Sequence, residues 1–181
     1  MIRLCYNGTD IGPLAQFNYR IGDVMKSCFF IGHREASSEL LPILTQVVEK
    51  HISAYGVTEF VVGGYGGFDH IAARAVVSLK QQYPQITLSL LIPYHPAERP
   101  IETPPGFDNT YYPPGMEKVP RKLAIVRANR YMVDHVDYLI AYAWHPASNA
   151  RDLVEYAYNR ERKGYIRITL IGRDGVLQSK Y

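Results

Sequence analysis

The stretch that decides the fold is Ser27-Cys28-Phe29-Phe30-Ile31-Gly32-His33-Arg34, an apolar run that ends in a glycine and a basic loop. Leucine, valine and isoleucine then recur at helical spacing up to Ile52, after a candidate N-cap at Ser37 or Ser38, and Gly56 fits the helix end. The same order of strand, glycine-containing loop and helix repeats along the chain. Strands that alternate with helices imply right-handed crossovers, so the sequence predicts an α/β fold.

The remaining elements follow from the same pattern. We expect strands near residues 60–62, 86–92, 137–142 and 165–171, and helices near 69–80, 120–132 and 150–162. The strands are continuously apolar, which is typical of strands buried on both faces. Residues 26–181 are therefore predicted to form a Rossmann-like domain, with a mostly parallel sheet of about five strands in the order 3-2-1-4-5 and helices on both faces. Residues 1–25 are expected to be an N-terminal extension, with an edge strand or hairpin.

The composition of the chain argues against nucleic-acid binding, membrane insertion and a disulfide-linked fold. Among 181 residues, 20 Lys+Arg and 17 Asp+Glu give a net charge of +3, and no basic run stands out, so nucleic acid is an unfavoured partner. No apolar window is long enough for a membrane-spanning helix, and the first residues lack the apolar core of a signal peptide. Two cysteines, Cys5 and Cys28, do not make a disulfide framework. We expect a cytoplasmic protein with reduced thiols and no membrane partner.

Ligands of open α/β sheets bind beyond the carboxyl ends of the strands, where the strand order reverses. The loop Gly32-His33-Arg34 leads to a helix N-terminus, where free N–H groups and the helix dipole attract anions, and Arg34 adds a bidentate donor. An ordinary tight turn is the alternative interpretation. The next such loop, Gly63-Gly64-Tyr65-Gly66-Gly67-Phe68-Asp69, has four glycines in five positions, which permits close backbone approach. It is neither a dinucleotide-binding fingerprint nor a P-loop, and Asp69 is either a pocket carboxylate or a helix cap.

Three later segments complete the predicted ligand-binding set. Residues 93–119 lack periodicity and hold seven prolines, and they also carry tyrosines suited to stacking a ring, of which Tyr94 belongs to the set. This loop is expected to serve either as a lid or as a contact between subunits. Asn129 and Arg130 lie on the third helix, although Arg130 is also spaced to pair with Asp134. The start of the fourth helix supplies the last members, Ser148, Asn149 and Arg151.

Metal and serine-hydrolase chemistry find little support in the sequence. Four histidines, His33, His70, His95 and His145, fall in different loops of the same predicted edge, but no His-x-x-x-His or Cys-x-x-Cys spacing accompanies them. No serine occupies a Gly-x-Ser-x-Gly elbow. We therefore expect neither a metal nor a cofactor.

Together, the stretch from Cys28 to Arg34, the glycine loop 63–69 and Asn129-Arg130-Tyr131-Met132-Val133-Asp134 resemble the SLOG superfamily, and most closely its YpsA-like branch. Pro93-Tyr94-His95-Pro96 and residues 112–120 extend the resemblance, which covers roughly residues 26–171. It implies a Rossmann-like fold that binds nucleotides or nucleotide-derived ligands. The superfamily includes sensor domains, the LOG phosphoribohydrolases, which cleave the N-glycosidic bond of a modified nucleoside monophosphate, and the DprA proteins, which bind single-stranded DNA.

The chain departs from the LOG pattern at two places. LOG enzymes carry Pro-Gly-Gly-x-Gly-Thr-x-x-Glu after the fourth strand, whereas this chain has Pro146-Ala147-Ser148-Asn149-Ala150-Arg151-Asp152-Leu153-Val154-Glu155. The glycines are absent, and the carboxylate of Asp152 or Glu155 is out of register. Ala128 stands where a basic residue usually precedes the asparagine. These departures weaken a catalytic interpretation more than a phosphate-binding one.

Three functions follow from these observations. The first is a sensor or regulatory protein that binds a nucleotide-derived molecule. Its phosphate is expected near Gly32-His33-Arg34 and Ser148-Asn149, its base or ribose against residues 63–68, and Asp69 on a ribose hydroxyl. The second is a LOG-like hydrolase with Asp69 and Glu155 as its carboxylates. The third, DprA-like binding of single-stranded DNA, is opposed by the charge balance. Relatives that self-associate make a homodimer the expected assembly.

Overall fold

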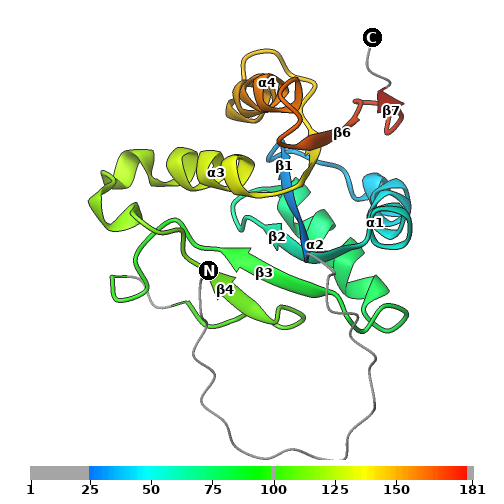
Figure 1. The fold of residues 1–181 in the computed structure, drawn as a ribbon, viewed down its shortest axis with the longest axis horizontal. Coiled ribbons are helices and arrows are strands. Elements are labelled where there is room, and N and C mark those ends of the chain that lie inside the picture. The colour runs from blue at the N-terminus through cyan, green and yellow to red at the C-terminus, as the bar shows by residue number, and fades with distance from the viewer. Residues whose placement is uncertain (1–24, 99–100, 179–181) are drawn as a thin grey trace, which may run out of the picture.

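A seven-stranded sheet forms the centre of the molecule (Figure 1). The computed structural model describes residues 25–98 and 101–178. The sheet has the order β4-β3-β2-β1-β5-β6-β7, and all of its pairs are parallel except β6 with β7. The strands are β1 (Lys26–Gly32), β2 (Val57–Val62), β3 (Thr87–Leu91), β4 (Asn109–Tyr111), β5 (Tyr138–Tyr142), β6 (Arg167–Ile171) and β7 (Leu177–Gln178).

The predicted α/β class and strand order are confirmed, but the predicted number of about five strands is wrong. The five expected strands are β1, β2, β3, β5 and β6, and they lie in the expected order. The two additional strands, β4 and β7, are three and two residues long and lie at the two edges of the sheet. Such short edge segments carry no apolar pattern of their own, because their pairing depends on contacts distant in sequence. At β4, for example, the Asp108 carboxylate accepts a hydrogen bond from the Leu88 amide at 2.7 Å.

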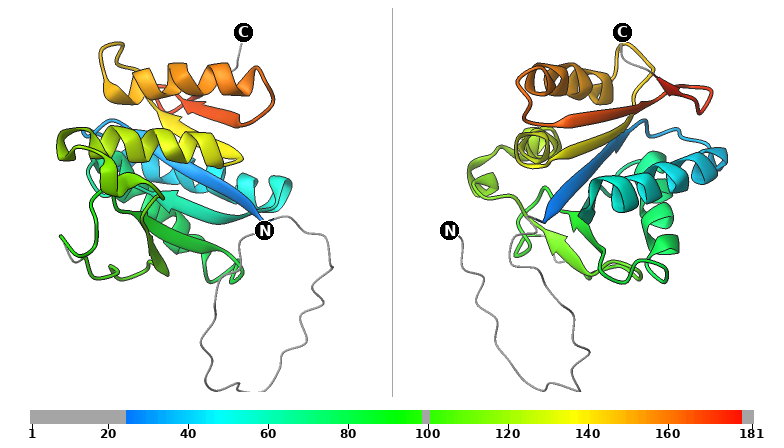
Figure 2. Two further views of the ribbon diagram at one scale, coloured as in Figure 1. Left: turned by 60° about the vertical axis from the view of Figure 1, so that its left-hand side comes forward. Right: turned by 45° about the vertical axis from the view of Figure 1, so that its right-hand side comes forward.

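Helices cover both faces of the sheet, as predicted (Figure 2). One face carries α1 (Leu41–Tyr55) and α2 (Gly67–Leu79), and the other carries α3 (Ala124–His135) and α4 (Asn149–Glu161). Short 3-10 turns at Ser38–Leu40 and Arg121–Leu123 lead into α1 and α3. Gly56 ends α1 in the left-handed conformation with φ 71°, as its position in the sequence predicts.

The strands are buried on both sides, so two separate cores form. Phe30 and Phe60 pack beneath α1 and α2, whereas Phe29 and Leu139 pack beneath α3 and α4. Cys28 lies in β1 and is fully buried. The continuous apolar run of β1 is the direct consequence of these two cores, because neighbouring residues point to opposite faces.

The order of the strands fixes where a ligand site can form. From β1 the chain crosses over to β2 on one side, whereas β5 pairs with β1 on the other side, so the strand order reverses between β1 and β5. The loops after β1, β2 and β5 therefore meet at one edge of the sheet. The predicted N-terminal strand or hairpin lies outside the described residues, apart from Met25. Among the residues described, no helix has both the length and the apolar character needed to cross a membrane.

Candidate functional site

A cavity of about 260 Å³ opens at this edge, between the ends of β1 and β2, α3 and the start of α4. We call it the switch-point cavity. Its floor is formed by β1, and its walls come from the loops after β1, β2 and β5. It is lined by Phe29, Phe30, Ile31, Gly32, His33, Arg34, Gly63, Tyr65, Gly66, Asp69, Ile125, Asn129, Ser148, Asn149 and Ala150.

His33 joins the loop after β1 to the loop after β5. Its backbone amide donates to the Tyr142 carbonyl at 3.1 Å, and its Nε2 accepts from the His145 amide at 3.0 Å. Its ring lies edge-on to Trp144, with the ring centroids 5.0 Å apart. Burial, and secondarily repulsion by His145, lower the pKa of His33 below its ordinary value. Both effects favour the neutral imidazole, whose Nε2 is the acceptor in this hydrogen bond, and His33 thereby connects two walls of the cavity.

Asp69 closes the glycine-rich loop. The residue is only 9% exposed, and its Oδ2 accepts hydrogen bonds from the backbone amides of Tyr65 at 3.1 Å and Gly66 at 3.2 Å. Burial raises the pKa of this carboxyl, while the two amide hydrogen bonds oppose that rise. The contacts of Asp69 are therefore those of a helix-capping residue, although it also lines the switch-point cavity.

The glycines of this loop make room for the chain itself. A Cβ on Gly67 would lie 2.6 Å from the Arg34 carbonyl oxygen, and a Cβ on Gly32 would lie 2.3 Å from the Phe68 ring. The Gly67 amide donates to that Arg34 carbonyl at 2.8 Å, and the Phe68 amide donates to the His33 carbonyl at 3.4 Å. The first amides of α2 are consequently occupied by the loop after β1.

The start of α4 is different, because its first amides are available. The N-cap Ser148 accepts the Arg151 amide at 3.2 Å through its Oγ and donates to the His145 carbonyl at 2.9 Å. The amides of Asn149 and Ala150 donate to no acceptor in the described part of the chain, and both residues line the switch-point cavity. Arg34 lines the same cavity and forms no ion pair with any residue in 25–98 or 101–178. Two free amides, the positive end of a helix dipole and a guanidinium make this a place for an anion.

The structure brings nine of the residues predicted from the sequence to this cavity: Gly32, His33, Arg34, Gly63, Gly66, Asp69, Asn129, Ser148 and Asn149. The other predicted residues do not line it: Gly64, Gly67, Phe68, Tyr94, Arg130, Arg151 and Glu155. Phe68 is fully buried. Tyr65 and Ile125 are two of the lining residues that the sequence analysis did not include, and they differ in how far the sequence could have indicated them. Tyr65 stands among the glycines, whereas Ile125 looks like any apolar helix residue.

Arg130 and Asp134 serve the contact between α3 and α4. The pairing of Arg130 with Asp134, which their spacing allowed, is not what the structure has. Asp134 Oδ1 instead accepts a hydrogen bond from the Tyr156 hydroxyl at 2.6 Å and forms an ion pair with Arg160 at 3.1 Å. The Arg130 guanidinium lies 4.0 Å from the centroid of the Tyr156 ring. Both residues therefore act on α4, which they hold beside α3.

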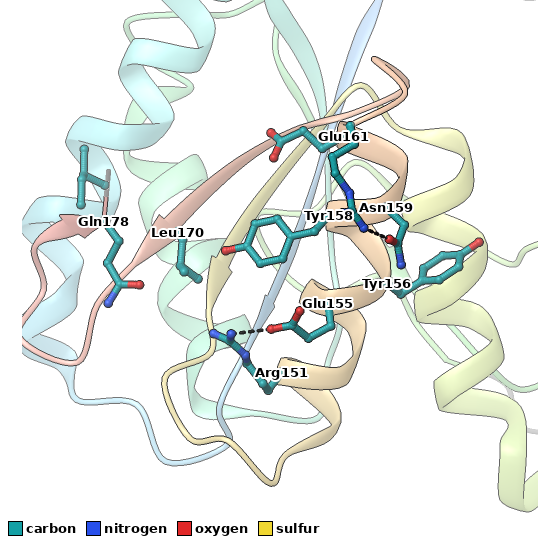
Figure 3. A pocket seen from close by; sticks show the side chains of 10 residues that line it. Arg151, Glu155, Tyr156, Tyr158, Asn159, Glu161, Leu170 and Gln178 are labelled. Carbon is teal, nitrogen blue, oxygen red and sulfur yellow. Dashed lines mark hydrogen bonds and ion pairs between the residues drawn. The ribbon is translucent and has the colours of Figure 1, made fainter. Parts of the chain in front are cut away.

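Arg151 and Glu155 line a different groove, between α4 and the strands β6 and β7 (Figure 3). The two side chains form an ion pair with each other. Tyr158, Leu170 and Gln178 complete this part of the groove. Because the groove is separate from the switch-point cavity, Glu155 does not share a cavity with Asp69. No cluster of three or more His, Cys, Asp or Glu side chains in residues 25–98 and 101–178 is arranged to hold a metal ion.

The fold and the cavity define a Rossmann-like α/β protein with a small site of mixed polar and apolar lining at its topological switch point. Residues 28–101 match the family model YpsA, described as the YspA SLOG family. The match runs from β1 to beyond β3 and includes both glycine loops. It confirms the resemblance to the YpsA-like branch of the SLOG superfamily, and it fits a nucleotide-related ligand or a LOG-like activity. No curated protein matches the chain.

Proposed function

We propose that this protein binds a nucleotide or a nucleotide-derived small molecule in the switch-point cavity, as a sensor or regulatory protein. The observation that carries the proposal is the pair of unoccupied amides at the start of α4, those of Asn149 and Ala150, beside Arg34. A phosphate group is the anion that best matches backbone donors at a helix N-terminus together with a guanidinium. Asp69 and Asn129 supply acceptor and donor groups for a ribose in the same cavity.

The test is titration calorimetry of the full chain with ribose 5-phosphate and with nucleoside monophosphates. We expect saturable binding, and we expect Arg34→Ala to weaken it roughly tenfold, because a charged hydrogen bond to phosphate is lost. Arg127→Ala is the matched control, since Arg127 is also an exposed arginine but lies on α3 outside the cavity lining. No binding of any phosphate compound by the unchanged protein would refute the proposal. Equal binding by the Arg34 variant would refute the assigned phosphate position.

A LOG-like phosphoribohydrolase is the second candidate, and the presence of the buried Asp69 carboxylate in the cavity favours it. Hydrolysis of an N-glycosidic bond needs a carboxylate that orients water and stabilises an oxocarbenium-like sugar. Two contacts argue for binding instead: Asp69 Oδ2 is already engaged by two amides, and Glu155 lies in the other groove. Chromatography of nucleoside monophosphates after incubation separates the two functions. Release of ribose 5-phosphate that is lost in Asp69→Asn would establish the enzyme, whereas binding without turnover supports the sensor.

A further inference from the structure

A second cavity, of about 170 Å³, adjoins the switch-point cavity along the same edge of the sheet. We call it the tyrosine cavity. It is built almost entirely from the segment between β3 and α3, which the sequence marked only by prolines and tyrosines. Its lining residues include Tyr94, His95, Glu98, Tyr112, Glu117 and Arg121.

The two cavities share a wall. Tyr65 lines the switch-point cavity and Tyr94 lines the tyrosine cavity, and their rings meet edge-on with the centroids 6.5 Å apart. Ala124 and Ile125, consecutive in α3, line the tyrosine cavity and the switch-point cavity respectively. Each cavity alone is smaller than the roughly 300–1,000 Å³ of a typical small-molecule site, whereas the two together fall within that range. The combined size of the two adjoining cavities therefore matches a ligand with one part in each.

Three aromatic rings, those of Tyr94, His95 and Tyr112, line the tyrosine cavity and make contacts with neighbouring groups. The Arg121 guanidinium lies 5.3 Å from the centroid of the Tyr94 ring, and His95 meets Tyr112 edge-on at 5.4 Å. Tyrosine faces of this kind stack with the flat rings of nucleobases. Fixed rings lose little freedom when a base stacks on them, so the cavity is prepared for a planar ligand.

Two carboxylates give the cavity a chemical preference. Glu98 and Glu117 both line it, and neither forms an ion pair with another residue that the structure describes. Burial raises the pKa of the Tyr112 phenol, and repulsion by Glu117 and then Glu98 adds to the rise. Both carboxylates therefore lie close enough to Tyr112 to affect its charge. Carboxylates accept hydrogen bonds and repel other acceptors. They favour a base whose edge carries adjacent donors.

We infer that the tyrosine cavity is the base pocket of the proposed nucleotide site and that it selects guanine. Guanine presents an N–H and an amino group side by side, which a carboxylate accepts together. Adenine and cytosine place a ring acceptor beside the amino group, and that acceptor would face the carboxylate. The inference rests on the proposed function, because the phosphate and ribose of the same ligand would occupy the switch-point cavity.

Titration calorimetry of the full chain with GMP, IMP, AMP and ribose 5-phosphate tests this assignment. IMP differs from GMP only by the absent amino group, so we expect GMP to bind roughly tenfold more tightly than either IMP or AMP. In the double variant Glu98→Gln/Glu117→Gln, we expect this preference to disappear. Glu102→Gln is the matched control, because Glu102 is exposed in the same segment and does not line the cavity. A second variant, Tyr112→Leu, should weaken all three nucleotides roughly tenfold and leave ribose 5-phosphate unaffected.

The outcomes separate this inference from the proposed function. If ribose 5-phosphate binds but the three nucleotides bind equally, or if AMP binds best, the base pocket is refuted and the phosphate site stands. A preference for GMP that survives in the double glutamine variant also refutes the role of the two carboxylates. If neither ribose 5-phosphate nor any nucleotide binds, the proposed function fails and the base pocket fails with it.

Discussion

The starts of α2 and α4 lie at the same edge of one sheet, yet their first amides have different partners. At α2, the amides of Gly67 and Phe68 donate to the carbonyls of Arg34 and His33, and the preceding loop is closed by Asp69. At α4, the amides of Asn149 and Ala150 line the switch-point cavity and have no acceptor in the described part of the chain. Helix α2, which follows the glycine-rich loop, is thus the helix whose first amides form hydrogen bonds within the protein.

Glycine content alone therefore does not locate an anion site. Glycines indicate that something approaches the backbone closely, and here the approaching group at Gly67 is the backbone of Arg34. An anion site instead needs helix amides that no carbonyl has taken. The two helices therefore differ in whether their first amides have acceptors, and substitutions at those residues can test this difference.

The largest expected effect comes from the same substitution at the first residue of each helix. Gly67→Ala places a Cβ 2.6 Å from the Arg34 carbonyl oxygen, so we expect a loss of about 3 kcal/mol in the free energy of unfolding. Asn149→Ala, at the exposed start of α4, should change it by less than about 0.5 kcal/mol. Urea denaturation of both variants measures the two values. Equal effects at the two helices would contradict the close approach at α2.

The next effect in size concerns the carboxylate that closes the glycine-rich loop. Asp69→Ala leaves the amides of Tyr65 and Gly66 without their acceptor, which we expect to cost about 2 kcal/mol in the free energy of unfolding. Asp69→Asn keeps a side-chain oxygen that accepts those amides, so most of the stability should return. Denaturation curves of the three proteins give the comparison. An alanine variant as stable as the unchanged protein would show that the loop closes without Asp69.

The smallest expected effect is a pH-dependent change in the hydrogen bond between His33, in the loop after β1, and His145, in the loop after β5. Because the pKa of His33 is lowered, first by burial and then by His145, the folded protein keeps this ring neutral to a lower pH than an ordinary histidine. Protonation of Nε2 then removes the acceptor of the His145 amide. Trp144 is the single tryptophan and packs against His33, so its fluorescence should fall as the ring becomes charged.

Fluorescence titration of the unchanged protein, of His33→Gln and of His70→Gln checks this link. We expect a midpoint below the ordinary histidine value in the unchanged protein and in the His70 control, and no such step in His33→Gln. A midpoint at or above the ordinary value would mean that His33 is neither desolvated nor an acceptor.

The fold could be predicted from the sequence where burial leaves a pattern. The centre of β1 and the whole of β5 are covered on both faces, so residues 28–31 and 138–142 form continuous apolar runs that identify these strands. The edge strands β4 and β7 leave no such pattern. Residues 109–111 belong to a proline-rich segment, and they form a strand only because β3 presents an open edge beside them.

The site could be predicted in outline but not in detail. Each loop that lines the switch-point cavity was marked by a glycine or by a helix start, and the rule for the carboxyl edge of a sheet brought those loops together. The sequence does not tell which amides are occupied, because the carbonyls of His33 and Arg34 reach α2 only through the tertiary fold. Nor does it place Arg130 against Tyr156, since spacing along α3 also allowed a partner on the same helix.

The free amides at the start of α4 are proposed to bind phosphate, and Asn149→Pro removes one of them. Proline is favoured at the first position of a helix and removes the N–H, and the extended Ser148, with φ −134° and ψ 147°, suits the residue before proline. Asn149→Ala is the control, because it keeps the amide. Calorimetry with ribose 5-phosphate should give an affinity roughly tenfold lower for the proline variant than for the alanine variant. Equal affinities in the two variants would contradict the claim.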